Sequence, residues 1–219
     1  MAAVGENLSV QYDGYAVYLP SLQRGYARYP LRDASKREAE TLPRGFEPSD
    51  LNFLSDQCKL WHCKYVLYSA GQFDRSVIST PDIVSTRSKD TVVIGDSGGY
   101  QIGTGKFPLV EGWHKHSKDP NLIFNKWMRE KSIRDMVLRW LDRYCDYAMT
   151  LDMPLWILNE KKSAKSPFAK LSAQQLIALS VENLRYFADK RGAATGAKAK
   201  YLNVLQDAGD GLVRLGTRR

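Results

Sequence analysis

The chain has 219 residues, of which 32 are Lys or Arg and 24 are Asp or Glu, so its formal net charge is +8. Hydrophobic residues make up 43% of it and charged residues 26%, which excludes collagen-like, coiled-coil and wholly disordered proteins. Apolar stretches are far shorter than the roughly 20 residues of a membrane span, and the first residues lack the pattern of an export signal. We therefore expect a soluble protein that neither spans a membrane nor is secreted.

The charge and the cysteines narrow the class further. A positive surplus favours polyanionic partners such as DNA or tRNA, and a solvated basic surface is the alternative that composition leaves open. The three cysteines, Cys58, Cys63 and Cys145, are an odd number without an export signal, which predicts free thiols and a cytoplasmic location. Cys58 and Cys63 flank His62 but lack the second ligand pair of a zinc site, so we expect no metal there.

The first fifty residues predict little regular structure. Residues 10–19 are aromatic and β-branched around one glycine, which indicates a hairpin or an opening strand. Residues 20–50 hold four prolines among mixed charges and predict loop with little helix. We therefore assign residues 1–50 to a loop-rich extension and residues 51–219 to the main domain.

Four apolar runs predict buried strands, at residues 64–70, 91–94, 147–151 and 201–205. A short helix over residues 50–60 is expected before the first strand. A polar residue follows three of these runs directly or closely: Asp96, Asp152 and Gln206. The carboxyl ends of strands carry the chemistry of α/β folds, so these three residues are candidates for function.

Two helices are expected between the later strands. Ser132 is the expected N-cap of the first, whose apolar residues keep helical spacing up to Tyr144. Ser172 and Gln175 form a capping box for the second, which Gly192 ends. Strands that alternate with helices predict parallel βαβ units in an α/β fold.

The string Gly-Asp-Ser-Gly-Gly at residues 95–99 is the most specific motif, and several interpretations compete for it. It fits the nucleophile elbow of α/β hydrolases, but the only later histidines are His114 and His116, with Glu111 as the one acid before them, which leaves no room for the later strands of that fold. It also resembles the serine motif of trypsin-like proteases, but His62 lies too close to Ser97 in sequence for two β-barrels. A glycine-rich turn without chemistry is a further alternative.

Residues 96–101, Asp-Ser-Gly-Gly-Tyr-Gln, resemble the Asp-Ser-Gly-Gly-(Phe/Tyr)-Gln signature of the tRNA-guanine transglycosylases, also called queuine or archaeosine tRNA-ribosyltransferases. Residues 146–152 resemble the family's Asp-Ile-Val-Met-x-x-Asp strand, and residues 203–206 resemble its Gly-Ile-Val-Gln strand. The resemblance covers roughly residues 64–206. The residues of the last two segments are more similar to those of the branch that inserts 7-deazaguanines into DNA.

This resemblance implies part of a (β/α)8 barrel, its N-terminal portion with about four parallel strands, in residues 51–219. It implies an enzyme that exchanges guanine for a 7-deazaguanine base in DNA or tRNA. By resemblance, Asp96 is the general acid/base, Tyr100 stacks on the base, Asp152 accepts hydrogen bonds from its N–H edge and Gln206 binds its carbonyl. The remaining pocket residues implied are Ser97, Gly98 and Gly99.

The sequence also departs from the family pattern. No residue matches the family's nucleophilic Asp or its zinc ligands (three Cys and a His), which follow the Gln strand, and Gln206 precedes Asp207 where the family has Gly. We therefore expect no cofactor in this chain and incomplete chemistry without a C-terminal half. The chain is then either a truncated or frameshifted gene product, or one half of a split enzyme whose second subunit supplies the missing half. The alternative is a non-catalytic nucleic-acid-binding or accessory protein that retains the base pocket.

Overall fold

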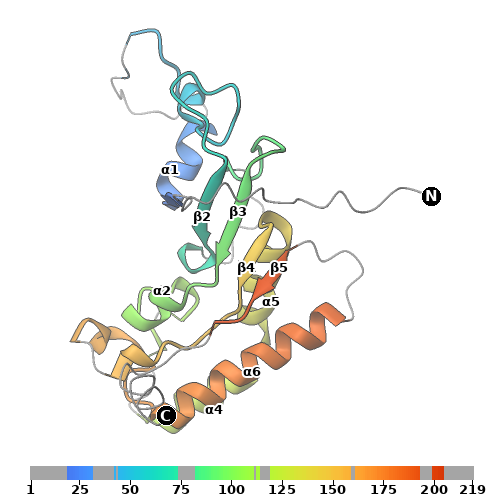
Figure 1. The fold of residues 1–219 in the computed structure, drawn as a ribbon. Helices are drawn as coiled ribbons and strands as arrows, with labels where there is room; N and C mark the ends of the chain where they lie inside the picture. The colour runs from blue at the N-terminus through green and yellow to red at the C-terminus, as the bar shows by residue number, and fades with distance from the viewer. Residues whose placement is uncertain are drawn as a thin grey trace, which may run out of the picture.

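The computed structural model describes residues 19–31, 42, 44–73, 82–110, 112–113, 119–158, 161–192 and 199–204. Within them a five-stranded parallel sheet follows chain order, β1-β2-β3-β4-β5 (Figure 1). The strands are β1 Ser21–Leu22, β2 Tyr65–Ser69, β3 Val92–Asp96, β4 Tyr147–Met149 and β5 Lys200–Leu202. The α/β prediction is confirmed, with one strand more than expected.

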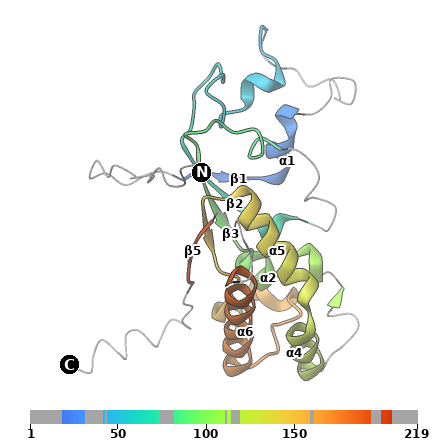
Figure 2. The same cartoon turned by 90° about the vertical axis from the view of Figure 1, so that its right-hand side faces the viewer.

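The helices of the described residues are α1 Arg24–Arg28, α2 Gly99–Thr104, α4 Pro120–Arg129, α5 Lys131–Tyr144 and α6 Ala173–Gly192. Short 3-10 turns include η3 Pro48–Leu51, η4 Ala70–Gln72, η7 Leu155–Leu158 and η8 Lys161–Lys165. Helices α5 and α6 lie on one face of the sheet, and α4 packs beside α6 (Figure 2). In this part of the chain no helix has the length and apolarity to cross a membrane.

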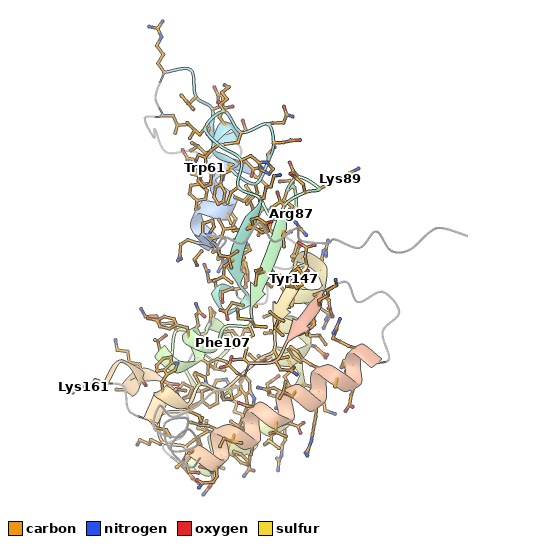
Figure 3. The ribbon with its side chains drawn as sticks, viewed as in Figure 1. Trp61, Arg87, Lys89, Phe107, Tyr147 and Lys161 are labelled. Carbon is orange, nitrogen blue, oxygen red and sulfur yellow. The ribbon has the colours of Figure 1, made fainter. Side chains whose placement is uncertain are left out.

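The register divides the sheet into a helix-covered face and an opposite face. One row across all strands is Leu22, Tyr68, Gly95, Ala148 and Tyr201, and the adjacent row is Ser21, Leu67, Ile94, Tyr147 and Lys200. In the first row, Tyr68 contacts Trp140 of α5 with ring centroids 5.2 Å apart, so this row faces the helices. The second row is half-buried or exposed, on the face opposite α5 and α6 (Tyr147 in Figure 3).

The two later helices form as their sequence pattern predicts, with one change of cap. In α6 the capping box is confirmed, because the Gln175 amide donates to Ser172 Oγ (3.2 Å) and the Ser172 amide donates to Gln175 Oε1 (2.9 Å). The expected Ser132 cap of α5 is wrong. The N-cap is Glu130, whose carboxylate accepts from the Ser132 amide at 3.0 Å and from the Ser132 hydroxyl. A negative charge also suits the positive end of the helix dipole.

The predictions for residues before 64 differ from the structure. The prediction of a helix over residues 50–60 is wrong, because η3 ends at Leu51 and turns follow. In these turns Asn52 Oδ1 and Ser55 Oγ each accept a hydrogen bond from the backbone amide two residues ahead. The loop expected over residues 20–50 contains β1 and α1, and β1 pairs with β2. The sheet therefore begins inside the segment assigned to an extension. The hairpin or strand expected at 10–19 lies outside the described residues except for residue 19.

Candidate functional site

Asp96 is the last residue of β3 and lies on the sheet face opposite the helices, two residues after Ile94. Its partner in the neighbouring strand is Ser69, at the end of β2. The Ser69 hydroxyl donates to Asp96 Oδ2 at 2.6 Å and accepts from the Gly71 amide at 3.2 Å. Because a hydrogen bond to a carboxylate is stronger than a neutral one, this contact holds the half-buried carboxyl group of Asp96 in one orientation.

Gly95 allows α5 to pack closely behind Asp96. A Cβ atom at Gly95 would lie 2.5 Å from Cys145 Sγ and 2.6 Å from Leu141 Cδ2, well inside van der Waals contact. The glycine before the catalytic candidate is therefore required by helix–sheet packing. Burial of Cys145 in this contact raises the pKa of its thiol, so the thiol stays protonated at neutral pH.

The glycine-rich turn after Asp96 leads into the short helix α2, which the sequence did not predict. Gly98 caps α2 with φ +101°, a left-handed conformation that favours glycine. A Cβ atom at Gly98 would lie 2.6 Å from the Cα of Gly71, so the turn is packed against the backbone of η4. The close approach of Gly98 and Gly71 places α2 directly beside the Asp96–Ser69 pair.

Ser97 connects two strands and is poorly placed to act as a nucleophile. Its side chain is 0% exposed, and its hydroxyl donates to the carbonyl of Thr150 at 3.0 Å. His62 lies 3.1 Å from the hydroxyl of Thr91, at the opposite end of β3, so it cannot serve as a base for Ser97. The geometry therefore disfavours a serine hydrolase based on Ser97 and His62.

Asp152 follows β4 and lies against the first turn of α2. It is 6% exposed, and its Oδ1 is 3.5 Å from Ser97 Oγ. A Cβ atom at Gly99 would lie 2.7 Å from the same oxygen, so Gly99 leaves room for the Asp152 carboxylate. The structure thus brings Asp152, Ser97 and Gly99 together, and it places two candidate carboxylates, Asp96 and Asp152, after neighbouring strands.

Tyr100 projects from α2 with 55% of its surface exposed, as a residue that stacks on a ligand must. Its ring centroid is 6.0 Å from that of Trp156 in η7, with the planes tilted by 39°. A Cβ atom at Gly103 would collide with the Trp156 ring, so Trp156 rests on the backbone of α2. Sequence reasoning missed Trp156; its position four residues after Asp152 is the signal that could have found it.

The remaining predicted site features are not brought together by the described residues. Gln206 lies outside them, as do His114 and His116. Cys58 Sγ donates to the carbonyl of Asp50 and Cys63 Sγ to that of Tyr65, each at 3.0 Å. In the described ranges no three His, Cys, Asp or Glu side chains are grouped to hold a metal ion, so these residues do not fit the zinc site that the resemblance implies.

No model of a known protein family, no curated protein and no solved structure matches this chain. The candidate site is described by the geometry of its own residues. It consists of a carboxylate held by a serine at a strand end, a buried carboxylate after the next strand, and an exposed tyrosine supported by a tryptophan.

Proposed function

We propose that this chain is a guanine transglycosylase-like protein that binds a purine-like base beside Asp96 and exchanges guanine for a 7-deazaguanine in DNA or tRNA. One observation carries the proposal. Asp96 is held by Ser69 at the end of β3, Asp152 follows the neighbouring strand, and the exposed ring of Tyr100 lies on the helix between them in sequence. Two carboxylates and an aromatic face suit a flat heterocycle with N–H donors.

The strand order supports a barrel of the transglycosylase type. In a (β/α)8 barrel, successive parallel strands are neighbours and the helices cover only the outer face. Doubly wound sheets instead reverse their strand order and carry helices on both faces. The order β1 to β5, with α5 and α6 on one face, is what the arc of a barrel requires. In this proposal the face that carries Ile94 and Asp96 is the interior of the barrel.

The roles proposed for the described residues rest on the positions of their side chains, and the role of Gln206 rests on the resemblance alone. Asp96 transfers protons to the leaving guanine and from the incoming base, Tyr100 stacks on the ring, and Asp152 accepts from its N–H edge. Ser97, Gly98 and Gly99 shape the pocket, and Gln206 binds the carbonyl of the base. In the family chemistry a second carboxylate attacks C1′ of the sugar as guanine leaves, and the incoming base then displaces it. The proposal assigns that nucleophile to a segment outside residues 64–206, the part of the chain that resembles the family.

A non-catalytic role in base or nucleic-acid binding is the second candidate. The observation that favours it is that Tyr100 is 55% exposed and Asp152 lies against Gly99 beside it, an arrangement that suits base binding without proton transfer by Asp96. A binder would hold the free base and lose that affinity when the Tyr100 ring is removed. It would not exchange bases in a polynucleotide.

Asp96→Asn is the direct test of the catalytic proposal. Radiolabelled guanine and DNA or tRNA are supplied to the protein reconstituted with the segment that carries the nucleophile, and guanine incorporation is followed over time. Loss of a general acid/base lowers rates by about 10²- to 10⁴-fold, so we expect at least a hundredfold loss in Asp96→Asn. Asp56→Asn, in an exposed turn, is the matched control and should exchange normally. Equal exchange by Asp96→Asn and the wild type would refute the role of Asp96.

A second measurement separates the two candidate functions. Calorimetric titration of the wild type with free guanine and 7-deazaguanine detects base binding whether or not exchange occurs. Binding that Tyr100→Ala abolishes, without exchange by the wild type, would establish the non-catalytic candidate. Base binding that is unchanged in Tyr100→Ala would exclude the pocket itself.

A further inference from the structure

Three segments that form or pack against α2 contain lysines and no acidic residue. Residues 97–110, 153–158 and 161–172 hold no Asp or Glu. Lys106, Lys161 and Lys165 in these segments are all exposed, and we call these three residues the lysine rim. Two exposed lysines elsewhere lie beside carboxylates: the Lys59 ammonium is 2.7 Å from Asp50, and the Lys64 ammonium is 3.9 Å from Asp90. Within these segments no carboxylate offsets the lysine charges, and the acidic residues next to them in sequence are Asp96, Glu111, Asp152 and Glu160.

Packing on α2 holds these segments beside the candidate site. The Ser166 hydroxyl donates to the carbonyl of Ile102 in α2 at 2.8 Å. The backbone of Gly105, the C-cap of α2, approaches η8 so closely that a Cβ atom would collide with the carbonyl of Lys165. Figure 3 shows Lys161 pointing into solvent at the same end of the sheet as Phe107, while Lys89 lies at the opposite end. The lysine rim is thus fixed to the helix that carries Tyr100.

Positive side chains beside an exposed aromatic ring are the combination that binds unstacked polynucleotides. Lysines attract phosphates through charge and the release of counterions, and an aromatic ring stacks on any base that is turned out of the helix. A base inside a duplex is covered on both faces, so it reaches a stacking residue only after it leaves the stack. Tyr100, supported by Trp156, offers such a ring within the basic surface.

We propose that the lysine rim binds the phosphates that flank an unstacked nucleotide whose base lies on Tyr100, so that the partner is a single-stranded or locally opened polynucleotide. Only the identity of the base rests on the proposed function. Phosphate binding by the rim and stacking on Tyr100 require neither base exchange nor Asp96. Oligonucleotide binding by the Asp96→Asn variant therefore tests this inference even if the catalytic proposal fails.

The test compares two variants of equal charge. Lys106, Lys161 and Lys165 are replaced together by Gln in one variant, and three exposed lysines outside the rim, Lys89, Lys131 and Lys190, are replaced by Gln in the control. Each variant lowers the formal charge by three, from +8 to +5. Fluorescence anisotropy with a labelled 12-nucleotide single strand measures the dissociation constant between about 50 and 200 mM salt, a range in which phosphate contacts weaken strongly.

Each phosphate contact contributes about 0.7 to the slope of log affinity against log salt for single strands. We expect the rim variant to lose about 2 units of slope and the control variant less than half of that. Equal slopes for the two variants would overturn the inference, because binding would then depend only on net charge. Absence of binding by the wild type would overturn it as well.

The stacking contact is tested with Tyr100→Ala and a duplex of the same sequence. Loss of one stacked base costs about 1–3 kcal/mol, so we expect single-strand binding to weaken about 5- to 150-fold while duplex binding changes little. Both DNA and RNA single strands are measured, and the stronger one identifies the polymer. Equal affinity of the wild type for duplex and single strand would refute the unstacked nucleotide. Polyglutamate binding that matches the oligonucleotide in affinity would reassign the rim to an acidic protein and overturn the proposal.

Discussion

Arg134 is the side chain whose replacement is expected to affect stability most clearly. It lies in α5 with 1% of its surface exposed, and its guanidinium closes the C-terminal end of α4. Nη2 donates to the carbonyl of Trp127 at 2.9 Å, and Nη1 donates to those of Met128 (3.3 Å) and Glu130 (3.0 Å). Nε donates to Asn183 Oδ1 of α6 at 2.7 Å. One buried cation therefore connects α4, α5 and α6.

Arg134→Met keeps most of the side-chain volume and removes these four hydrogen bonds. Two acceptors retain other partners, because the Trp127 carbonyl also accepts from the Glu130 amide and Asn183 Oδ1 also accepts from Trp127 Nε1. Loss of a hydrogen bond to a charged donor costs about 1.5–3 kcal/mol, and less at the partly buried carbonyls of Met128 and Glu130, whereas release of the desolvated charge offsets part of the loss. We expect the free energy of unfolding to fall by about 2–3 kcal/mol.

Urea unfolding followed by circular dichroism measures this difference. With a dependence of about 2–3 kcal/mol per molar urea, the midpoint of Arg134→Met should shift by about 1 M. Arg139→Met on the same helix is the matched control, because Arg139 is exposed and donates only to the Asp135 carbonyl among the hydrogen bonds described; its effect should stay within about 0.5 kcal/mol. An unchanged midpoint for Arg134→Met would refute the assignment of Arg134 as the link between the three helices.

Two further changes probe the sheet. Gly95→Ala places a methyl group against Cys145 and Leu141, so we expect the free energy of unfolding in urea to fall by about 1–3 kcal/mol. Gly25→Ala is the control, because no atom lies within 4 Å of its new Cβ. Equal stability of the two variants would contradict the packing argument. Burial raises the pKa of the Asp82 carboxyl group. The ionised Asp82 therefore lowers the free energy of unfolding once pH has risen through the folded pKa. This loss of stability vanishes below the unfolded pKa of about 3.9. In paired urea titrations the free energy of unfolding of the wild type should therefore rise relative to that of Asp82→Asn as pH falls from 7 to 4. A difference between the two free energies that does not change with pH would contradict the raised pKa of Asp82.

The sequence by itself determined the features that depend on neighbours within a turn or on a short apolar run. The capping box of α6 joins residues three apart, Ser172 and Gln175, so its signal is complete in the sequence. Strands β2, β3 and β4 lie at predicted apolar runs, and the alternation of strands with helices correctly indicated a parallel α/β sheet. The position of Asp96 at a strand end also followed, because Asp96 comes two residues after the predicted run 91–94.

Only the tertiary structure decided the contacts between residues far apart in the chain. Ser69 and Asp96 are 27 residues apart, and Ser97 and Thr150 are 53 apart, so no local pattern could assign Ser69 to the carboxylate or bury Ser97. The tie of Trp156 to α2 likewise depends on how η7 packs against a glycine in another element. Sequence patterns record the free energy of nearby residues, whereas the pairing of distant strand ends is set by the register of the sheet and the packing behind it.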